Sequence, residues 1–205
     1  MKDLSICIPT YNRDPFLAWT LAKTVADFPA AKVIVSDNGK STLDLPSGVR
    51  YIRQPQNIGA FPNMRAALLA ASTKYCMFVA DDDYLLPDEV QKGIDFLETH
   101  PEVLVYYAPC QLYNEIEQKA DWDAFYVSED KTFTRADELW NFVMHRHVWP
   151  EHAIYRRARL DEILQPRTPS PRTNSPRTED CRRQFGRYRN GGTRHCRKRA
   201  PTFAQ

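Results

Sequence analysis

The sequence predicts an α/β fold in which a mostly parallel central sheet is covered by helices on both faces. Short apolar runs alternate with stretches of helical periodicity through residues 1–107, the pattern of parallel strands joined by helices. Polar clusters follow several of these runs directly, as expected where ligands gather at the carboxyl ends of such strands. At 205 residues, the chain is long enough for one domain of this kind with a core.

The first elements are the clearest. "LSICI", residues 4–8, is an apolar run closed by Pro9, which indicates a buried strand. Asp14 and Pro15 then favour a helix start, and apolar residues follow at helical spacing. "KVIVS", residues 32–36, predicts the second strand.

The same alternation continues to residue 107. Further strands are expected at residues 49–53, 75–80 and 103–107, and further helices at about residues 62–72 and 87–99. Beyond this point the pattern weakens. "TRADELWNFVMHRH" has helical spacing, and "HAIYRRARLDEIL" predicts a short strand followed by a helical start.

Charge divides the chain into two parts. Residues 165–205 contain ten Arg, one Lys and two acidic residues, whereas residues 1–164 contain 17 basic and 24 acidic residues. The last segment also has no Leu, Ile, Val or Met, and Pro-Arg-Thr recurs in it. Such a segment cannot bury enough surface to offset the entropy of ordering, so residues 165–205 are predicted to be disordered. The abrupt change near Leu164 also suggests a shifted reading frame, a hypothesis that sequencing the native locus would test.

The N-terminal segment and the cysteines indicate a cytoplasmic protein. "MKDLSICIPT" has no apolar signal region, and no run reaches the roughly 18 apolar residues of a membrane span. Cys7 and Cys76 lie within apolar runs and are expected to be reduced core thiols. Attachment to the inner face of the membrane stays open.

Polar residues follow three of the expected strands. Residues 10–12 follow the first, Asp37 and Asn38 the second, and residues 81–83 the fourth. Each cluster by itself could be a helix cap or a turn. Because the carboxyl ends of parallel strands lie along one edge of a sheet, the three together predict one binding site.

The run Asp81-Asp82-Asp83 predicts a divalent cation. Carboxylates this close repel one another and raise each other's pKa, so the cluster needs a positive charge among it or access to water. Mn²⁺ and Mg²⁺ prefer oxygen ligands, and magnesium usually completes its shell with water and substrate phosphates. The run therefore indicates Mn²⁺ or Mg²⁺ and a phosphate-bearing substrate. The alternative is a set of exposed acids at a strand end.

Four motifs, in order and spacing, resemble the family 2 glycosyltransferases of the GT-A fold across residues 4–107. They are "SICIPTYNR", "VIVSDNG", "NIGAFPNMRAAL" and "KYCMFVADDDYLLPDEV". The resemblance implies a Rossmann-like GT-A fold, a nucleotide-sugar donor such as a UDP- or dTDP-sugar, and a divalent metal. It also implies transfer with inversion to a hydroxyl of a saccharide or lipid-linked acceptor, in cell-envelope polysaccharide synthesis.

The resemblance also divides the chain and assigns its residues. Residues 1–107 would be the donor-binding half and residues 108–164 a partial acceptor-side region, truncated or frame-shifted after about residue 164. The residues expected to bind the nucleotide sugar are Pro9, Thr10, Tyr11, Arg13, Asp37, Asn38, Asn57, Gly59, Asn63, Asp81 and Asp82. Asp37 would hydrogen-bond the base, and Asp83 with Asp81 would hold the metal of a D-x-D motif.

An inverting transfer also needs a base that takes the proton from the acceptor hydroxyl. The family places this Asp or Glu well past the D-x-D motif, and here the corresponding position falls just after Leu164, where the Pro-Arg-Thr repeats begin. Glu151 is the nearest acid before that point and is the candidate base.

Three alternatives stay open. The chain could be a donor-binding remnant that lacks its base, or a sugar-phosphate nucleotidyltransferase, although "PTYNRDP" after the first strand is not a Gly-rich phosphate loop. It could also bind nucleic acid through its Arg-rich tail. The body is acidic and the tail has few aromatic residues, so no specific nucleic-acid partner is expected.

Overall fold

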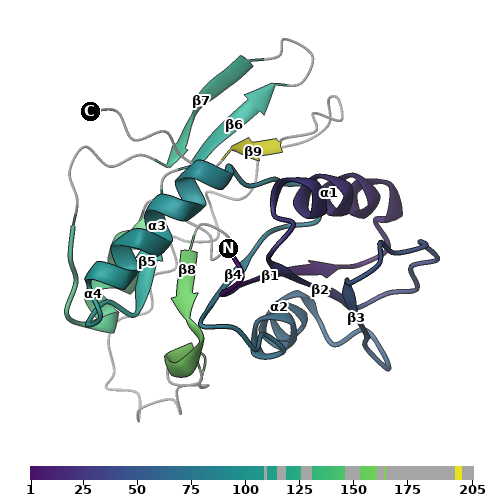
Figure 1. Ribbon diagram of the computed structural model, residues 1–205, viewed down its shortest axis with the longest axis horizontal. Coiled ribbons are helices and arrows are strands. Elements are labelled where there is room, and N and C mark those ends of the chain that lie inside the picture. Colours follow the sequence, from purple (N-terminus) through teal and green to yellow (C-terminus); the bar gives the residue numbers. More distant parts are fainter. Residues whose placement is uncertain are drawn as a thin grey trace, which may run out of the picture.

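A six-stranded sheet forms the centre of the protein (Figure 1). The computed structural model describes residues 1–108, 110–114, 119–125, 131–145, 153–160, 164 and 197–199. The strands are β1 (Leu4–Thr10), β2 (Lys32–Asp37), β3 (Arg50–Arg53), β4 (Tyr75–Phe78), β5 (Val105–Tyr107), β6 (Cys110–Asn114), β7 (Lys119–Phe125), β8 (Ala153–Arg156) and β9 (Arg197–Arg199). The helices are α1 (Asp14–Asp27), α2 (Ala60–Leu69), α3 (Pro87–Thr99) and α4 (Ala136–His145), and a 3₁₀ turn covers Arg157–Arg159.

The strand order of the central sheet is β3-β2-β1-β4-β8-β5. β1 pairs in parallel with β2 and β4, and β2 pairs in parallel with β3. β8 runs antiparallel to both β4 and β5 and lies between them. The expected α/β fold with a mostly parallel sheet is confirmed, and β8 is its antiparallel member.

Element boundaries follow the local signals closely, with differences of up to three residues at strand ends and at both ends of α2. A proline lies in the first turn of both α1 and α3, where its missing N–H costs nothing. β4 ends at Phe78, two residues before the expected end, because the chain leaves the sheet to form the aspartate loop. β6 and β7 pair antiparallel, with register shifts in the ladder, in a part of the chain where the weaker sequence pattern predicted no strand.

Alternation along β1 packs the two faces of the sheet differently. Leu4, Ile6 and Ile8 are fully buried in a cluster that includes side chains of α1 and α3. Cys7 points the other way, into a cluster with Ala67 of α2. Because successive strand residues face opposite sides, Pro9 lies on the α2 face and Thr10 on the α1 face at the end of the strand. Each fully buried aliphatic side chain contributes about 1.5–3 kcal/mol to stability.

A second, three-stranded sheet has the order β7-β6-β9. β9, Arg197–Arg199, is the part of residues 165–205 that the structure describes, and it pairs antiparallel with β6. The disorder expected for the remainder of that segment falls on residues outside the described ranges.

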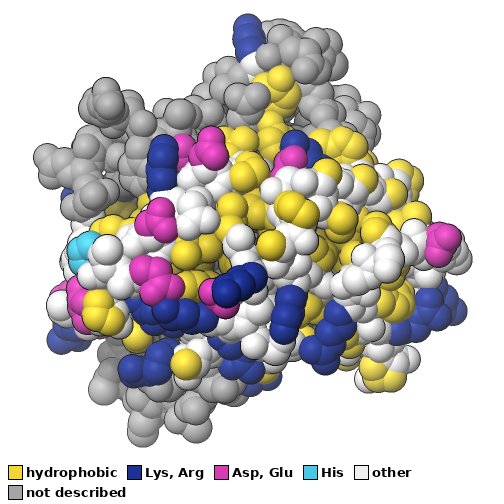
Figure 2. Space-filling model, viewed as in Figure 1, with side chains coloured by type: hydrophobic (Ala, Val, Ile, Leu, Met, Phe, Trp, Pro, Cys, Tyr) yellow, Lys and Arg dark blue, Asp and Glu magenta, His cyan; other side chains and the backbone are white. Residues whose placement is uncertain are grey.

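On the face shown in Figure 2, hydrophobic side chains gather in the middle and Lys and Arg side chains lie along the lower border. Acidic side chains gather on the left, in the region of α3 in Figure 1. Within the described residues, the structure contains no helix with the length and apolar character needed to span a bilayer.

Candidate functional site

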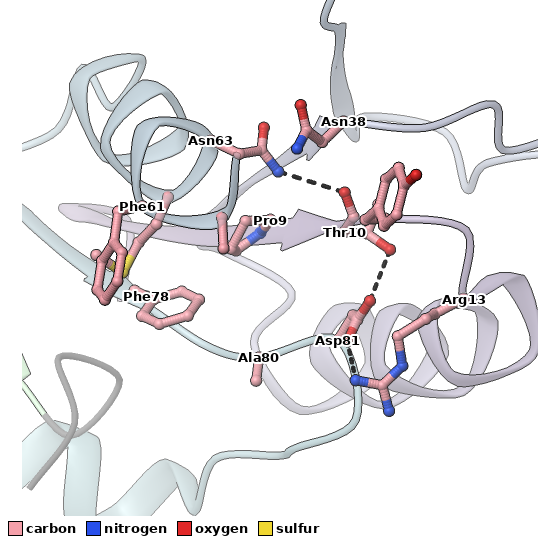
Figure 3. Close-up of a pocket in the computed structure, with 12 residues that line it drawn as sticks. Pro9, Thr10, Arg13, Asn38, Phe61, Asn63, Phe78, Ala80 and Asp81 are labelled. Carbon is pink, nitrogen blue, oxygen red and sulfur yellow. Dashed lines mark hydrogen bonds and ion pairs between the residues drawn. The ribbon is translucent and has the colours of Figure 1, made fainter. Parts of the chain in front are cut away.

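A cavity of about 310 Å³ opens at the carboxyl ends of β1 and β4, beside the first turn of α2 (Figure 3). It is lined by Pro9, Thr10, Tyr11, Arg13, Asn38, Ala60, Phe61, Asn63, Met64, Phe78, Ala80 and Asp81. These residues come from four segments of the chain, which meet only because β1, β2 and β4 are neighbours in the sheet. The structure thus brings the three polar clusters together at one edge.

Most of the expected binding residues lie at this cavity. Those that line it are Pro9, Thr10, Tyr11, Arg13, Asn38, Asn63 and Asp81. The others, Asp37, Asn57, Gly59, Asp82 and Asp83, are not among its lining residues. They adjoin it through hydrogen bonds or along the chain.

Asp81 is tied to both β1 and α1. Thr10 Oγ1 donates a hydrogen bond of 2.7 Å to Asp81 Oδ2, and both residues are buried. Thr20, on α1, donates to the backbone oxygens of Asp81 at 2.9 Å and of Asp83 at 3.2 Å. The aspartate loop is therefore held from two sides.

Arg13 supplies the positive charge in the aspartate cluster. Its Nη1 lies 3.1 Å from Asp81 Oδ1, and its Nη2 donates to Asp82 Oδ2 at 2.7 Å. Burial opposes the charge of Arg13, but the hydrogen bond to Asp82 and the charges of all three aspartates raise its pKa overall. Burial raises the pKa of Asp81, and the hydrogen bond from Thr10 and the charge of Arg13 oppose this. The guanidinium of Arg13 thus offsets part of the repulsion among the three aspartates.

The donor atoms of the aspartate run suit Mn²⁺ or Mg²⁺, because all are hard carboxylate oxygens. Both oxygens of Asp81, however, already have partners, Thr10 and Arg13. Of the two aspartates bound to Arg13, Asp82 is more accessible than Asp81, with 28% of its side chain exposed. In the described part of the chain, no three His, Cys, Asp or Glu side chains converge as a ready metal site. The carboxylates therefore fit a metal ion best when Arg13 has moved away from them.

Asp37 organises the loop after β2. It is fully buried. Its Oδ1 accepts a hydrogen bond from the backbone N–H of Gly39 at 2.7 Å, and its Oδ2 accepts from Ser41 N–H at 2.9 Å and from the Tyr51 hydroxyl at 2.5 Å. The expected bond from Asp37 to a nucleobase stays a prediction, and in this structure the carboxylate holds the loop.

Three asparagines join the loops around the cavity. Asn38 donates from Nδ2 to Asn57 Oδ1 at 2.7 Å and accepts from the backbone N–H of Ile58 at 2.7 Å. Asn63 donates from Nδ2 to the backbone oxygens of Thr10 and Ser36, so α2 is anchored to the ends of β1 and β2. The family resemblance indicated these asparagines in the sequence, but only the fold shows which groups they join.

Gly59 immediately precedes α2 and has φ of +92°. This backbone conformation is open to glycine and strained for other residues. It turns the chain sharply into the helix and directs the first turn of α2 towards the cavity.

The end of the cavity away from Arg13 is apolar, a feature that the sequence pattern did not indicate. Figure 3 shows Phe61 and Phe78 at this end and Arg13 with Asp81 at the other. Phe61 is 68% exposed although it is a large hydrophobic residue, and Tyr11 is 49% exposed. Apolar residues such as Phe61 and Met64 carry no sequence signal that separates them from core positions of α2.

The candidate base Glu151 lies outside the described residues, so its place relative to the cavity stays a prediction.

The sequence model of Glycosyl transferase family 2 matches residues 5–164. A glycosyltransferase of Haemophilus influenzae, itself uncharacterised, is 29% identical over 122 residues, which cover 55% of this chain and 41% of the relative. An uncharacterised protein of Mycobacterium bovis is 27% identical over 125 residues, which cover 55% of this chain and 36% of the relative. The chain therefore spans about two fifths of the length of these relatives.

Among solved structures, a mannosyltransferase from Pyrobaculum calidifontis, in complex with GDP-Man and Mn²⁺, superposes with a TM-score of 0.51. The two sequences are 15% identical, and the match covers 79% of this chain and 46% of that one. A likeness at this level of identity concerns the fold.

Proposed function

Because this chain belongs to glycosyl transferase family 2, we propose that it binds a nucleoside-diphosphate sugar in the cavity at the ends of β1 and β4. The proposed reaction moves the sugar to an acceptor hydroxyl with inversion at the anomeric carbon. The proposed acceptor is a saccharide or a lipid-linked saccharide of cell-envelope polysaccharide synthesis. The proposed place of action is the cytoplasm, at or near the inner face of the membrane.

The observation that carries this proposal is the two-ended character of the cavity. At one end the guanidinium of Arg13 and the hydroxyl of Thr10 lie beside Asp81, and at the other lie Phe61 and Phe78. A diphosphate needs cations and hydrogen-bond donors, whereas a base or the face of a sugar needs flat apolar surface. The volume of about 310 Å³ falls in the range of small-molecule sites.

Each residue has a proposed role in the donor complex. Arg13 bonds a phosphate oxygen through its guanidinium, because planar N–H donors suit phosphate geometry. Tyr11 and Phe61 offer exposed rings against which a base or sugar can pack. Asp83 and Asp81, with Asp82 beside them, are the proposed holders of Mn²⁺ or Mg²⁺, which neutralises the charge that the leaving diphosphate gains.

Isothermal titration calorimetry with UDP, dTDP and GDP, each with and without Mn²⁺, tests the proposal. GDP belongs in the panel because a structural relative was solved with GDP-Man and Mn²⁺. We expect at least one nucleotide to bind, more tightly with Mn²⁺, and Asp83→Ala to remove the gain from Mn²⁺. Asp44→Ala, at an exposed carboxylate, is the matched control and should behave as wild type. Failure of every nucleotide to bind would contradict the proposal.

A second candidate is a donor-binding domain with little transfer activity. It is favoured by the end of the family match at residue 164, where the Pro-Arg-Thr segment begins. A positioned base contributes roughly 10²–10⁴-fold in rate, and Glu151 is the proposed base. Turnover of a bound sugar nucleotide that falls about 10²-fold in Glu151→Gln supports the transferase. Tight nucleotide binding with no turnover supports the donor-binding domain.

A further inference from the structure

Arg13 occupies the position of a cation among the three aspartates. It bridges two carboxylates, at 3.1 Å from Asp81 Oδ1 and 2.7 Å from Asp82 Oδ2. We propose that Arg13 is a built-in counter-ion that competes with free divalent metal for Asp81 and Asp82. A metal ion then binds well only together with a nucleoside diphosphate. The part that concerns the nucleotide rests on the proposed function.

The burial of Asp81 is the first reason for the proposal. Only 7% of its side chain is exposed, and a buried carboxylate without a partner is costly. One of its oxygens accepts from Thr10 at 2.7 Å and the other faces Arg13. Thr10 and Arg13 therefore compensate the charge of Asp81 from within the chain.

The geometry of the guanidinium is the second reason. An arginine presents several N–H donors in one plane and can serve two carboxylates at once, which a lysine does less well. A doubly charged ion bound to the same carboxylates would lie within a few ångströms of this charge. Like charges at such distances repel one another even at a protein surface. Arg13 therefore lowers the affinity of the aspartates for a free divalent ion when no nucleotide is bound.

The position of Arg13 also gives it a second partner. Its side chain is 40% exposed and lines the cavity, so it can turn from the carboxylates towards a ligand. A diphosphate offers oxygens to the guanidinium and to the ion together, and it adds the negative charge that the two cations need. Nucleotide and metal should therefore strengthen each other's binding, and this coupling is reciprocal.

Binding of Mn²⁺ alone to the full chain tests the counter-ion, with free Mn²⁺ followed by electron paramagnetic resonance. We expect Arg13→Gln to bind Mn²⁺ at least about tenfold more tightly than wild type in the absence of nucleotide. Arg50→Gln removes the same charge from an exposed arginine that bonds the backbone oxygen of Ala70, and it should leave Mn²⁺ affinity unchanged. Circular dichroism checks that each variant is folded.

A conservative variant covers the case in which Arg13→Gln does not fold. Arg13→Lys keeps a positive charge but cannot bridge both carboxylates, so we expect a smaller gain in Mn²⁺ affinity, roughly threefold. If the folded Arg13 variants bind Mn²⁺ no more tightly than wild type, the proposal that Arg13 is a counter-ion is overturned.

The two proposals can fail separately. If no nucleotide binds but Arg13→Gln binds Mn²⁺ more tightly, the proposed function is wrong and the proposed role of Arg13 as a counter-ion is supported. If nucleotides bind but the affinity for Mn²⁺ without nucleotide does not change in the Arg13 variants, the proposed role of Arg13 is wrong and the proposed function is supported.

Discussion

Thr10 and Asp81 are joined by a 2.7 Å hydrogen bond across 71 positions of the sequence. Both are buried, and the bond connects the end of β1 with the loop after β4. Arg13 reaches the same carboxylate from the start of α1. The polar end of the cavity is therefore one connected unit, and its parts can be tested one at a time.

Thr10→Val removes the donor and keeps the size of the side chain. The buried Asp81 oxygen then lacks a partner, so we expect the free energy of unfolding to fall by about 1–3 kcal/mol. Urea unfolding followed by circular dichroism measures this. Thr42→Val, at an exposed threonine, should change the free energy of unfolding by no more than about 0.5 kcal/mol. Equal losses in both variants would show that the Thr10–Asp81 bond has no special weight.

Gly59→Ala places a side chain on a backbone with φ of +92°. We expect a loss of about 1–3 kcal/mol in the free energy of unfolding, together with weaker nucleotide binding, because Gly59 directs α2 towards the cavity. Gly48→Ala is the matched control, with φ of +87° and no atom within 4 Å of the added Cβ. It should lose stability but keep nucleotide affinity. A variant Gly59→Ala with wild-type affinity would argue against a role of this turn in the site.

Phe61→Ala should separate binding from stability. Phe61 is 68% exposed, so we expect the free energy of unfolding to change by no more than about 0.5 kcal/mol. Loss of one aromatic stack should weaken nucleotide binding by roughly 1 kcal/mol or more, about fivefold. Calorimetry and urea unfolding measure the two quantities. In contrast, Phe78→Ala at the buried side of the same cavity should cost about 3–5 kcal/mol of stability. If Phe61→Ala binds nucleotide as tightly as wild type, the apolar end of the cavity is not part of the binding site.

The two core cysteines provide a test that depends on pH. Burial raises the pKa of Cys76 to about 12 and raises the pKa of Cys7 well above its ordinary value. Because the thiolate is the reactive form, iodoacetamide at pH 8 should leave both unlabelled in the folded chain and label both in urea. Peptide mass spectrometry identifies the labelled sites. Rapid labelling of Cys76 in the folded chain would contradict its burial.

The same shift predicts how alkali affects stability. The folded pKa of Cys76 lies above its ordinary value of 9.0, so the unfolded chain releases this proton first as the pH rises. The stability present below pH 9 is therefore lost progressively towards pH 12, at up to about 1.4 kcal/mol per pH unit. Urea unfolding at pH 8 and pH 10 should show a smaller difference in Cys76→Ser than in wild type.

Much of the fold could be predicted from local patterns. α3 begins and ends at the expected residues, α1 begins at the expected residue, and β1 and β2 agree to within two residues. The reason is that apolar spacing and proline signals act over a few neighbouring residues: β1, α1 and α3 carry both signals, and β2 carries the apolar run. The edge of the sheet where the polar clusters meet could also be predicted, because parallel strands joined by helices align their carboxyl ends.

The contacts inside the site could not be predicted in the same way. Three features of the site depend on contacts between distant segments. Arg13 bridges Asp81 and Asp82, Asp37 accepts hydrogen bonds from Tyr51 and from loop amides, and Phe61 lies at the cavity. The antiparallel place of β8 between β4 and β5 is of the same kind. Residue types and their spacing thus specify the elements and the edge at which the polar groups collect. Which groups pair there depends on strand order and packing, because a carboxylate or an aromatic ring looks the same in the sequence whatever partner the fold brings to it.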